Sequence, residues 1–152
     1  MSKCLELLKS GVYMLLVRLD KEFLDKVGSL GMVKLDKGLY IYVGSAKGGF
    51  LKRLKRYCMK NIRKPHWHID YLLVHGKALG AYIIPNEYLS EAHIVNSLLR
   101  ILEQATPRFG ATDTKDLTHL FKYHKGRIRD IIKRYRAIYF SCNEILKCLN
   151  LP

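Results

Sequence analysis

Long, largely apolar runs bounded by glycine or charged residues alternate along the first third of the chain. Runs of this length and β-branched content are typical of buried strands. Gly28 and Gly31 mark a turn before residues 32–35, and the residues Asp36-Lys37-Gly38 indicate a hairpin between neighbouring strands. We therefore predict a twisted antiparallel sheet built from adjacent hairpins. Its strands are residues 12–19, 22–27, 32–35 and 39–44, and the second of these is expected to pair with the first.

A helical spacing replaces this pattern after the glycine-containing loop at residues 45–49. Apolar side chains then recur every three or four residues while basic residues occupy the other face, which predicts an amphipathic, cationic helix from Phe50. Pro65 ends this helix, and residues 66–75 predict a second helix that stops at Gly76.

The second half of the chain predicts one more strand and two more helices. Residues 78–84 form a short apolar run typical of a strand. Ser90 is a suitable N-cap for a helix from Glu91 to about Glu103, because its hydroxyl can accept a hydrogen bond from the first turn. A basic helix is predicted at residues 126–149.

The chain has the size and apolar content of one domain, with 152 residues of which 49% are hydrophobic. The predicted fold class is α/β, in the α+β arrangement: a small, mostly antiparallel twisted sheet flanked by about three or four helices. We predict a single domain over residues 1–152, with a core at about 11–123 and a basic helical extension at about 124–152.

The net positive charge of the chain limits the classes of partner that it is expected to bind. The chain holds 27 Lys and Arg against 13 Asp and Glu, a formal charge of +14, and this excess costs self-repulsion that a polyanion would relieve. A membrane surface would call for a helix with a broad apolar face beside the charges, so nucleic acid is the expected partner. The basic residues form two clusters. A solvated helix face would explain either cluster alone, but two clusters on one short chain favour nucleic-acid binding. The first contains Lys47, Lys52, Arg53, Lys55, Arg56, Lys60, Arg63 and Lys64, and the second contains Lys122, Lys125, Arg127, Arg129, Lys133, Arg134 and Arg136.

The sequence also predicts a cellular location. Neither end carries an apolar stretch long enough to span a bilayer, and residues 1–10 lack the layout of a secretory signal, so we expect a cytoplasmic protein without a membrane partner. In that reducing compartment we expect free buried thiols rather than disulfides or metal ligands at the four cysteines, which form no CxxC pair: Cys4, Cys58, Cys142 and Cys148.

Two tyrosines carry the first candidate chemistry. Tyr13 and Tyr42 lie in predicted strands that a hairpin can bring side by side, each within two residues of a glycine. Tyrosine is common in strands, so a core or edge position would explain either residue alone.

The order of the surrounding residues changes that interpretation. Gly11-Val12-Tyr13 and Tyr42-Val43-Gly44, followed by Ser45-Ala46-Lys47 and a helix with Lys52-Arg53-Leu54-Lys55-Arg56, closely resemble the signature of the GIY-YIG nuclease superfamily. The block from His66 to Leu73, with the later Phe109-Gly110 and His119-Leu120-Phe121, resembles a largely archaeal branch of that superfamily. The resemblance covers roughly residues 11–123.

The resemblance implies roles for particular residues. The superfamily carries an essential arginine on the helix after the second tripeptide and a metal-binding glutamate on a later helix, which here correspond to Arg53 and Glu91. It implies that Tyr13 takes a proton from the attacking water if a cation lowers its pKa, with Tyr42 ordering the water or the phosphate. A guanidinium suits bidentate phosphate binding, and a lone carboxylate suits Mg²⁺ or Mn²⁺, which keeps several waters. No small-molecule organic cofactor is expected.

This chain departs from the superfamily in two places. The gap between the tripeptides, residues 14–41, is longer than usual, so strands are expected to be inserted there. Cysteines that the branch tends to carry after Phe109-Gly110 are replaced by Thr112-Asp113-Thr114-Lys115, so we expect no metal or redox role for that loop.

Alternatives remain for each assignment. Arg56 could replace Arg53, and Glu91 could be a helix-capping acid with Glu87 or Glu103 as the ligand. His66 and His68 are two residues apart on a predicted helix and point to different sides, so one of them, with His66 as our candidate, is expected to shuttle a proton or contact phosphate rather than share a metal. Trp67 and Tyr71 are expected in the core. The candidate nucleic-acid contacts are Lys47, Lys52, Arg56, Tyr57, Lys60, Arg63 and Lys64.

The sequence therefore predicts a metal-dependent endonuclease that hydrolyses phosphodiester bonds in repair or processing, with DNA favoured over RNA. A nucleic-acid-binding module that cuts weakly or not at all is the alternative, because basic clusters alone would suffice for it. Substrate structure, sequence specificity and oligomeric state are not predicted.

Overall fold

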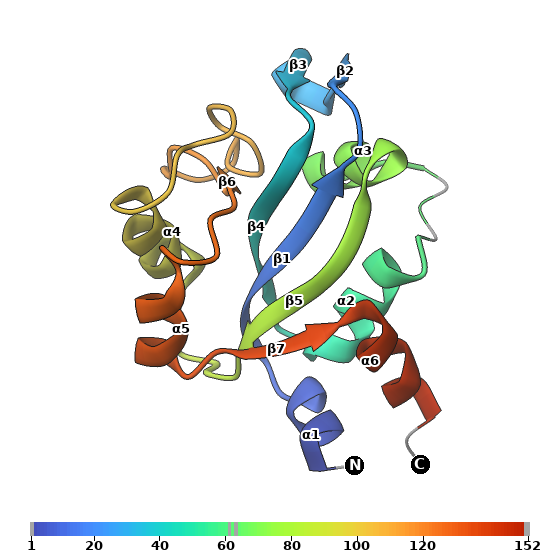
Figure 1. Ribbon diagram of the computed structural model, residues 1–152, viewed down its shortest axis with the longest axis vertical. Coiled ribbons are helices and arrows are strands. Elements are labelled where there is room, and N and C mark those ends of the chain that lie inside the picture. Colours follow the sequence, from blue (N-terminus) through green and yellow to red (C-terminus); the bar gives the residue numbers. More distant parts are fainter. Residues whose placement is uncertain (1, 61, 63, 151–152) are drawn as a thin grey trace.

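The computed structural model describes residues 2–60, 62 and 64–150 of the chain (Figure 1). A five-stranded sheet in the order β6-β4-β1-β5-β7 forms its centre, and every pairing in it is antiparallel. The predicted α+β class is thus confirmed. The strands are β1 (Gly11–Leu19), β4 (Gly38–Ala46), β5 (Lys77–Ile84), β6 (Leu120–Lys122) and β7 (Ile138–Ser141).

Strands β2 (Phe23–Lys26) and β3 (Met32–Leu35) form a separate two-stranded sheet that continues the β1–β4 pair beyond the main sheet (Figure 1). The predicted insertion between the tripeptides is confirmed. The predicted pairing of residues 22–27 with the first strand is wrong, and so is the hairpin at residues 36–38. The turn predicted at Gly28 and Gly31 is confirmed and lies at the tip of β2–β3, where Gly31 adopts φ +75° and its carbonyl accepts a 2.8 Å hydrogen bond from the amide of Val27.

Six α-helices occur within the described residues, more than predicted. Helices α2, α3 and α6 lie on one side of the sheet and α4 and α5 on the other (Figure 1). Short 3-10 turns follow α1 and α6, and a third one lies between β2 and β3. The helices are α1 (Ser2–Leu5), α2 (Phe50–Cys58), α3 (His68–His75), α4 (Glu91–Leu99), α5 (Arg129–Tyr135) and α6 (Cys142–Lys147).

Each face of the sheet has its own apolar core. In β1, Tyr13 and Leu15 belong to the core beneath α2 and α3, whereas Val12 and Met14 belong to the core beneath α4 and α5. A strand covered on both faces needs apolar residues at consecutive positions. That requirement explains why the first strand is one continuous apolar run rather than an alternating pattern.

The predicted helix at residues 126–149 is wrong. Helix α5 ends at Arg136, whose backbone is left-handed with φ 53°, and the chain then adds β7 to the sheet beside β5. Ser141 starts α6 through a capping box, because its hydroxyl accepts from the Glu144 amide while the Glu144 carboxylate accepts from the Ser141 amide. The β-branched and aromatic residues just before Ser141 favour a strand over a helix.

Three other helix bounds differ from prediction. Helix α2 ends at Cys58, well before Pro65. Helix α4 ends at Leu99 rather than near Glu103, and α3 begins at His68 rather than at residue 66. No helix in the described part of the chain combines the length and the apolar character needed to cross a membrane.

The prediction of free thiols is wrong. Disulfides join Cys4 to Cys148 and Cys58 to Cys142, across 144 and 84 residues of sequence. The second bond ties the end of α2 to the start of α6, which share the same face of the sheet. Spacing along the chain did not reveal these pairs, because each unites residues that become neighbours only after the sheet forms.

Candidate active site

A cleft of about 620 Å³ opens beside the last residues of β4. The edge strand β6 pairs only with Tyr40 to Tyr42, and one further bond runs from the Val43 amide to the His119 carbonyl at 2.9 Å. Among the described residues, no strand covers β4 on that side after Val43. The short edge strand therefore leaves room for side chains from both faces of the sheet to meet. All five candidate catalytic residues line the cleft: Tyr13, Tyr42, Arg53, His66 and Glu91.

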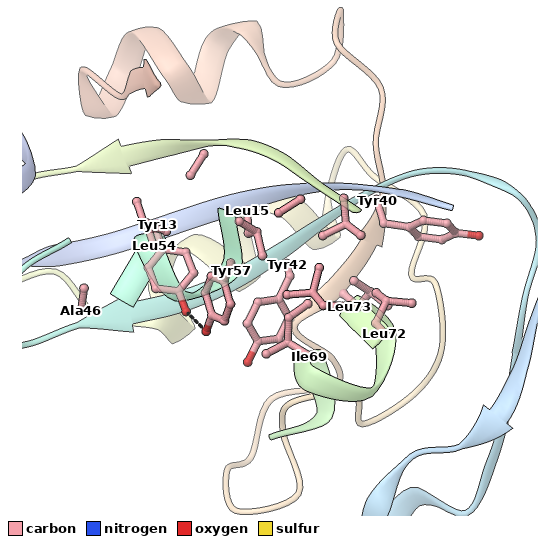
Figure 2. Close-up of a cluster of buried hydrophobic side chains, with 14 of the residues drawn as sticks. Tyr13, Leu15, Tyr40, Tyr42, Ala46, Leu54, Tyr57, Ile69, Leu72 and Leu73 are labelled. Atoms are coloured by element: carbon pink, nitrogen blue, oxygen red, sulfur yellow. Dashed lines mark hydrogen bonds between the residues drawn. The ribbon is translucent and has the colours of Figure 1, made fainter. Parts of the chain in front are cut away.

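Three buried tyrosines form one side of the cleft. The predicted pairing of the two tyrosine strands is confirmed, with Tyr13 opposite Gly44 and Leu15 opposite Tyr42. Tyr57 of α2 completes the set, since its hydroxyl lies 2.9 Å from that of Tyr13, and the phenols gather beneath the sheet (Figure 2).

The glycines of both tripeptides have steric causes. The Tyr13 hydroxyl lies directly over Gly44, where a Cβ would overlap it. At Gly11 a Cβ would overlap the carbonyl oxygen of Ile84 in the neighbouring strand. The two glycines thus allow the backbones and the Tyr13 ring to approach closely.

Burial keeps these phenols neutral. It is the main reason why the pKa of Tyr13 lies well above the usual value for tyrosine, with the nearby Tyr57 and Tyr42 adding to the effect. Burial also raises the pKa of Tyr42 and that of Tyr57. Arg53 acts in the opposite direction on all three, as the prediction for Tyr13 requires, but burial outweighs it.

Arg53 extends from α2 into the cleft. Partial burial alone would lower its pKa, but the neighbouring phenols of Tyr13 and Tyr57 hold that pKa above its ordinary value. Arg53 is an exposed residue and lines the cleft together with these phenols. We call the set of Tyr13, Tyr42, Tyr57 and Arg53 the phenol wall.

Arg56, on the next turn of α2, has a different environment. Its guanidinium donates two bonds, of 2.7 and 2.9 Å, to Asp70, whose side chain is 0% exposed. Asp70 also accepts from the amides of His66 and Trp67, both at 2.9 Å. Burial would raise the pKa of Asp70, but these donors hold it below its ordinary value. Arg56 therefore fixes α2 to the start of α3 and does not line the cleft.

Glu91 enters the cleft from the other side of the sheet, as the first residue of α4. The predicted N-cap is confirmed, because the hydroxyl of Ser90 accepts a 3.2 Å bond from the amide of His93. One oxygen of the Glu91 carboxylate accepts a hydrogen bond from the hydroxyl of Ser45, and the other lies 3.3 Å from Nδ1 of His119.

His119 links two carboxylates. Its side chain is only 2% exposed, and its Nε2 lies 2.8 Å from Asp116 while its Nδ1 faces Glu91. The imidazole thus holds the Glu91 carboxylate from behind. We call Glu91, Ser45, His119 and Asp116 the carboxylate wall. Sequence reasoning placed His119 in the superfamily resemblance but assigned it no role, and neither Ser45 nor Asp116 carries a spacing signal that would reveal the chain of contacts.

The segment before α3 forms the rim of the cleft. His68 accepts a 2.7 Å bond at Nδ1 from the amide of Gly110, and burial lowers the pKa of His68 although Asp113 opposes this. His66 packs edge-on against Trp67 with ring centroids 4.7 Å apart. The prediction that Trp67 belongs to the core is wrong, since it is half exposed and lines the cleft. Tyr71 packs partly buried against the core, as expected.

The predicted nucleic-acid contacts divide into several groups. Lys47 and Tyr57 line the cleft, whereas Arg56 is occupied by Asp70. Arg63 lies outside the described residues. The remaining three are exposed near the cleft-bearing helix without lining the cleft: Lys52, Lys60 and Lys64.

The two alternative glutamates lie elsewhere. Glu87 lines a different cavity, and Glu103 is an exposed residue 3.6 Å from the ammonium group of Lys122. Neither lines the cleft.

A divalent cation fits the cleft through one carboxylate. Within the described residues no group of three His, Cys, Asp or Glu side chains converges as a metal cage. Mg²⁺ and Mn²⁺ accept hard oxygen ligands, and Mg²⁺ usually keeps several waters with one or two protein carboxylates. The partly exposed carboxylate of Glu91 meets that requirement, and Asp113 lines the same cleft.

Comparison with known proteins assigns a family. A family model described as "Domain of unknown function DUF123" matches residues 12–139. The matched range holds both walls of the cleft and ends inside β7. No curated protein and no solved structure matches the chain significantly.

Proposed function

We propose that this chain, which belongs to the family "Domain of unknown function DUF123", is a metal-dependent endonuclease that hydrolyses phosphodiester bonds, with DNA as its substrate. One observation carries the proposal: residues as far apart as Tyr13 and Glu91 line a single cleft beside Arg53. A core role for the tyrosines would not require an exposed guanidinium and a carboxylate at the same place. The arrangement is the one that the resemblance to the GIY-YIG superfamily implies.

Arg53 is assigned to the phosphate. A guanidinium presents a planar fork of donors that can bind two phosphate oxygens as negative charge develops on them. Arg53 is exposed and lines the cleft, and Lys47 adds a second cation there. The chain's formal charge of +14 supports a polyanionic substrate.

The phenols are assigned to the attacking water. Tyr42 orders the water or the phosphate by hydrogen bonding, which a neutral phenol can do. Tyr13 is the candidate for taking the proton from the water, and Arg53 favours its ionised form against the stronger effect of burial on its pKa. His66, at the rim, is assigned to a proton or phosphate contact.

Glu91 would hold Mg²⁺ or Mn²⁺. When bound, such an ion supplies neutralisation of charge on the phosphate and makes a coordinated water more acidic. Ser45 and His119 orient the Glu91 carboxylate from two directions, so the carboxylate is presented to the cleft in one geometry.

The test is nicking of supercoiled plasmid by purified protein with Mg²⁺ or Mn²⁺. Glu91→Gln removes the negative ligand while keeping the shape, and we expect it to abolish nicking. Glu103→Gln is the matched control, because Glu103 is an exposed alternative candidate that lines neither this cleft nor another described cavity, and it should cut like the native protein. Full activity of Glu91→Gln would refute the metal assignment.

A non-catalytic nucleic-acid-binding module is the second candidate. Burial of Tyr13, which keeps its pKa well above the ordinary value, favours it. Such a module would bind with a steep salt dependence whether or not metal is present, and it would nick no substrate under any metal condition. Gel shifts with duplex DNA, branched DNA and RNA distinguish the substrate classes.

A cytoplasmic location and a role in DNA repair or processing belong to this proposal. Stable intracellular disulfides are characteristic of hyperthermophilic archaea and bacteria, which is compatible with the two bonds found here and with the largely archaeal branch that the sequence resembles. Cell fractionation under alkylating conditions tests the location and the oxidation state together.

A further inference from the structure

A second cavity, of about 830 Å³, lies next to the cleft. It is formed by the residues before β1, the turn after β5 and the end of α5. Ser10 lines it, and the Ser10 hydroxyl donates a 2.9 Å hydrogen bond to the carbonyl of Lys47, which lines the cleft. The Ser10–Lys47 contact therefore joins the lining of the cleft to that of this cavity.

The side chains of this flanking cavity suit an anion with a flat ring. Arg134 and Arg136 are exposed, and within the described residues no carboxylate lies within salt-bridge distance of either. Lys9 adds a third cation, although it pairs with Glu6 at 3.0 Å, and Glu87 is the only acid among the described residues that line the cavity. Cations therefore outnumber acids around it.

Tyr88 supplies the ring. It is 90% exposed, so its ring is open to a ligand in the cavity that it lines. Its amide donates a 3.0 Å bond to the Asn86 side chain, so the turn that presents the ring is ordered. A base can stack on such a ring only if one of its faces is free. Bases inside a duplex have both faces stacked on neighbouring bases, so the base must come from a single strand.

We propose that the flanking cavity binds single-stranded nucleic acid adjoining the cleavage site, with Tyr88 stacking on a base and Arg134 and Arg136 binding the phosphates beside it. The inference rests on the proposed function and deepens it. It makes the substrate a junction between paired and unpaired strands rather than a uniform duplex.

The test is binding without cleavage, measured by fluorescence anisotropy of a labelled oligo-dT in EDTA. Tyr88→Ala should weaken binding roughly tenfold, because base–aromatic stacking is lost, while Tyr88→Phe should bind like the native protein. In the double variant Arg134→Ala/Arg136→Ala, the slope of log affinity against log salt should fall by about 1.4, from two lost phosphate contacts on a single strand. Arg100→Ala, an exposed arginine at the end of α4 that lines neither cavity, is the matched control and should change neither quantity.

Two further arms define the ligand. A duplex with a single-stranded overhang should bind more tightly than the blunt duplex, and Tyr88→Ala should abolish that difference. Oligo-rU in place of oligo-dT decides whether the bound strand is DNA or RNA, and a Tyr88-dependent preference for either supports the site. Equal binding of oligo-dT by native protein and Tyr88→Ala, with an unchanged salt slope in the arginine variant, would overturn it. Because no arm depends on cutting, a failure of the endonuclease proposal gives a different result, namely intact binding with no nicking.

Discussion

The two walls of the cleft are held in place by different kinds of interaction. The phenol wall is built from buried rings that the apolar core keeps uncharged, with one exposed guanidinium at its margin. The carboxylate wall is a chain of polar contacts from Ser45 through Glu91 and His119 to Asp116. One wall takes its geometry from packing and the other takes it from hydrogen bonds and charge.

The difference indicates how each wall responds to change. A packed ring is held by many weak contacts, so losing one hydroxyl leaves its position intact. A carboxylate held by two polar partners loses a large part of its orientation when one of them is removed. We therefore expect substitutions on the phenol wall to separate chemistry from stability, and those on the carboxylate wall to act through metal binding.

The largest expected effect comes from the support beneath the phenol wall. Arg56→Ala leaves the Asp70 carboxylate buried without its partner, so the free energy of unfolding should fall by about 3 kcal/mol, the low end for a buried pair because Arg56 is partly exposed. Urea denaturation measures it. Lys55→Ala, at the adjacent exposed position, should stay within about 0.5 kcal/mol of native. Equal stability of the two variants would show that the pair does not anchor α2.

Arg53→Ala tests the exposed margin of the same wall. The rate of plasmid nicking at saturating substrate should fall about 10²- to 10³-fold, the loss typical for one donor that stabilises developing oxyanion charge. The unfolding free energy should change little, because the guanidinium is exposed. Lys55→Ala again serves as the control, and a comparable rate loss in both variants would reduce Arg53 to general electrostatic attraction.

His119→Gln tests the carboxylate wall. We expect Mn²⁺ affinity, measured by calorimetry without nucleic acid, to fall roughly tenfold, because partners behind a metal ligand typically contribute that much or more. Asp116→Asn should have an effect in the same direction with less disturbance of packing. Asp130→Asn, on the exposed surface of α5, should leave the affinity unchanged. An unaltered Mn²⁺ affinity in both wall variants would mean that Glu91 needs no support.

The smallest effect concerns the pH dependence of stability. Tyr13 has a higher pKa in the folded protein than in the unfolded chain, where it is about 10. The unfolded state therefore loses this proton first, and the stabilisation is complete below pH 10 and declines as the pH rises toward the folded-state value. Tyr13→Phe should lose about 1 kcal/mol at pH 8 from the missing hydrogen bond to Tyr57.

Urea titrations at pH 8 and pH 11 check this sign. The native protein should lose more stability between the two conditions than Tyr13→Phe does. A larger loss in the variant would contradict the direction of the pKa shift.

Local signals in the sequence predicted much of the first 99 residues of the fold. The strand at Gly11 to Leu19, the amphipathic α2 and the Ser90 cap each depend on neighbours within one element, which a sequence displays directly. The pairing of the tyrosine strands was also predicted, from a hairpin arrangement of the first strands. The insertion between them and its turn at Gly28 and Gly31 were expected, whereas the hairpin placed at residues 36–38 was wrong.

Long-range features could not be predicted in the same way. The basic residues of the C-terminal part suggested one helix, because charge masks the short apolar run at Ile138 that joins the sheet edge. The role of His119 depends on β6 bringing it behind Glu91, which no spacing encodes. The disulfides depend on the same kind of closure.

The disulfides also make the covalent structure a ring. From Cys4 to Cys148 the oxidised backbone is closed on itself, and the bond from Cys58 to Cys142 runs across that ring. An unfoldase that pulls on the chain reaches a disulfide before it can extract any strand of the sheet. It would then have to translocate two segments of the chain at the same time. Reduction of the disulfides converts the ring into a linear chain. The two disulfides therefore contribute, together with the packing of the sheet, to the protein's resistance to unfolding by such an enzyme.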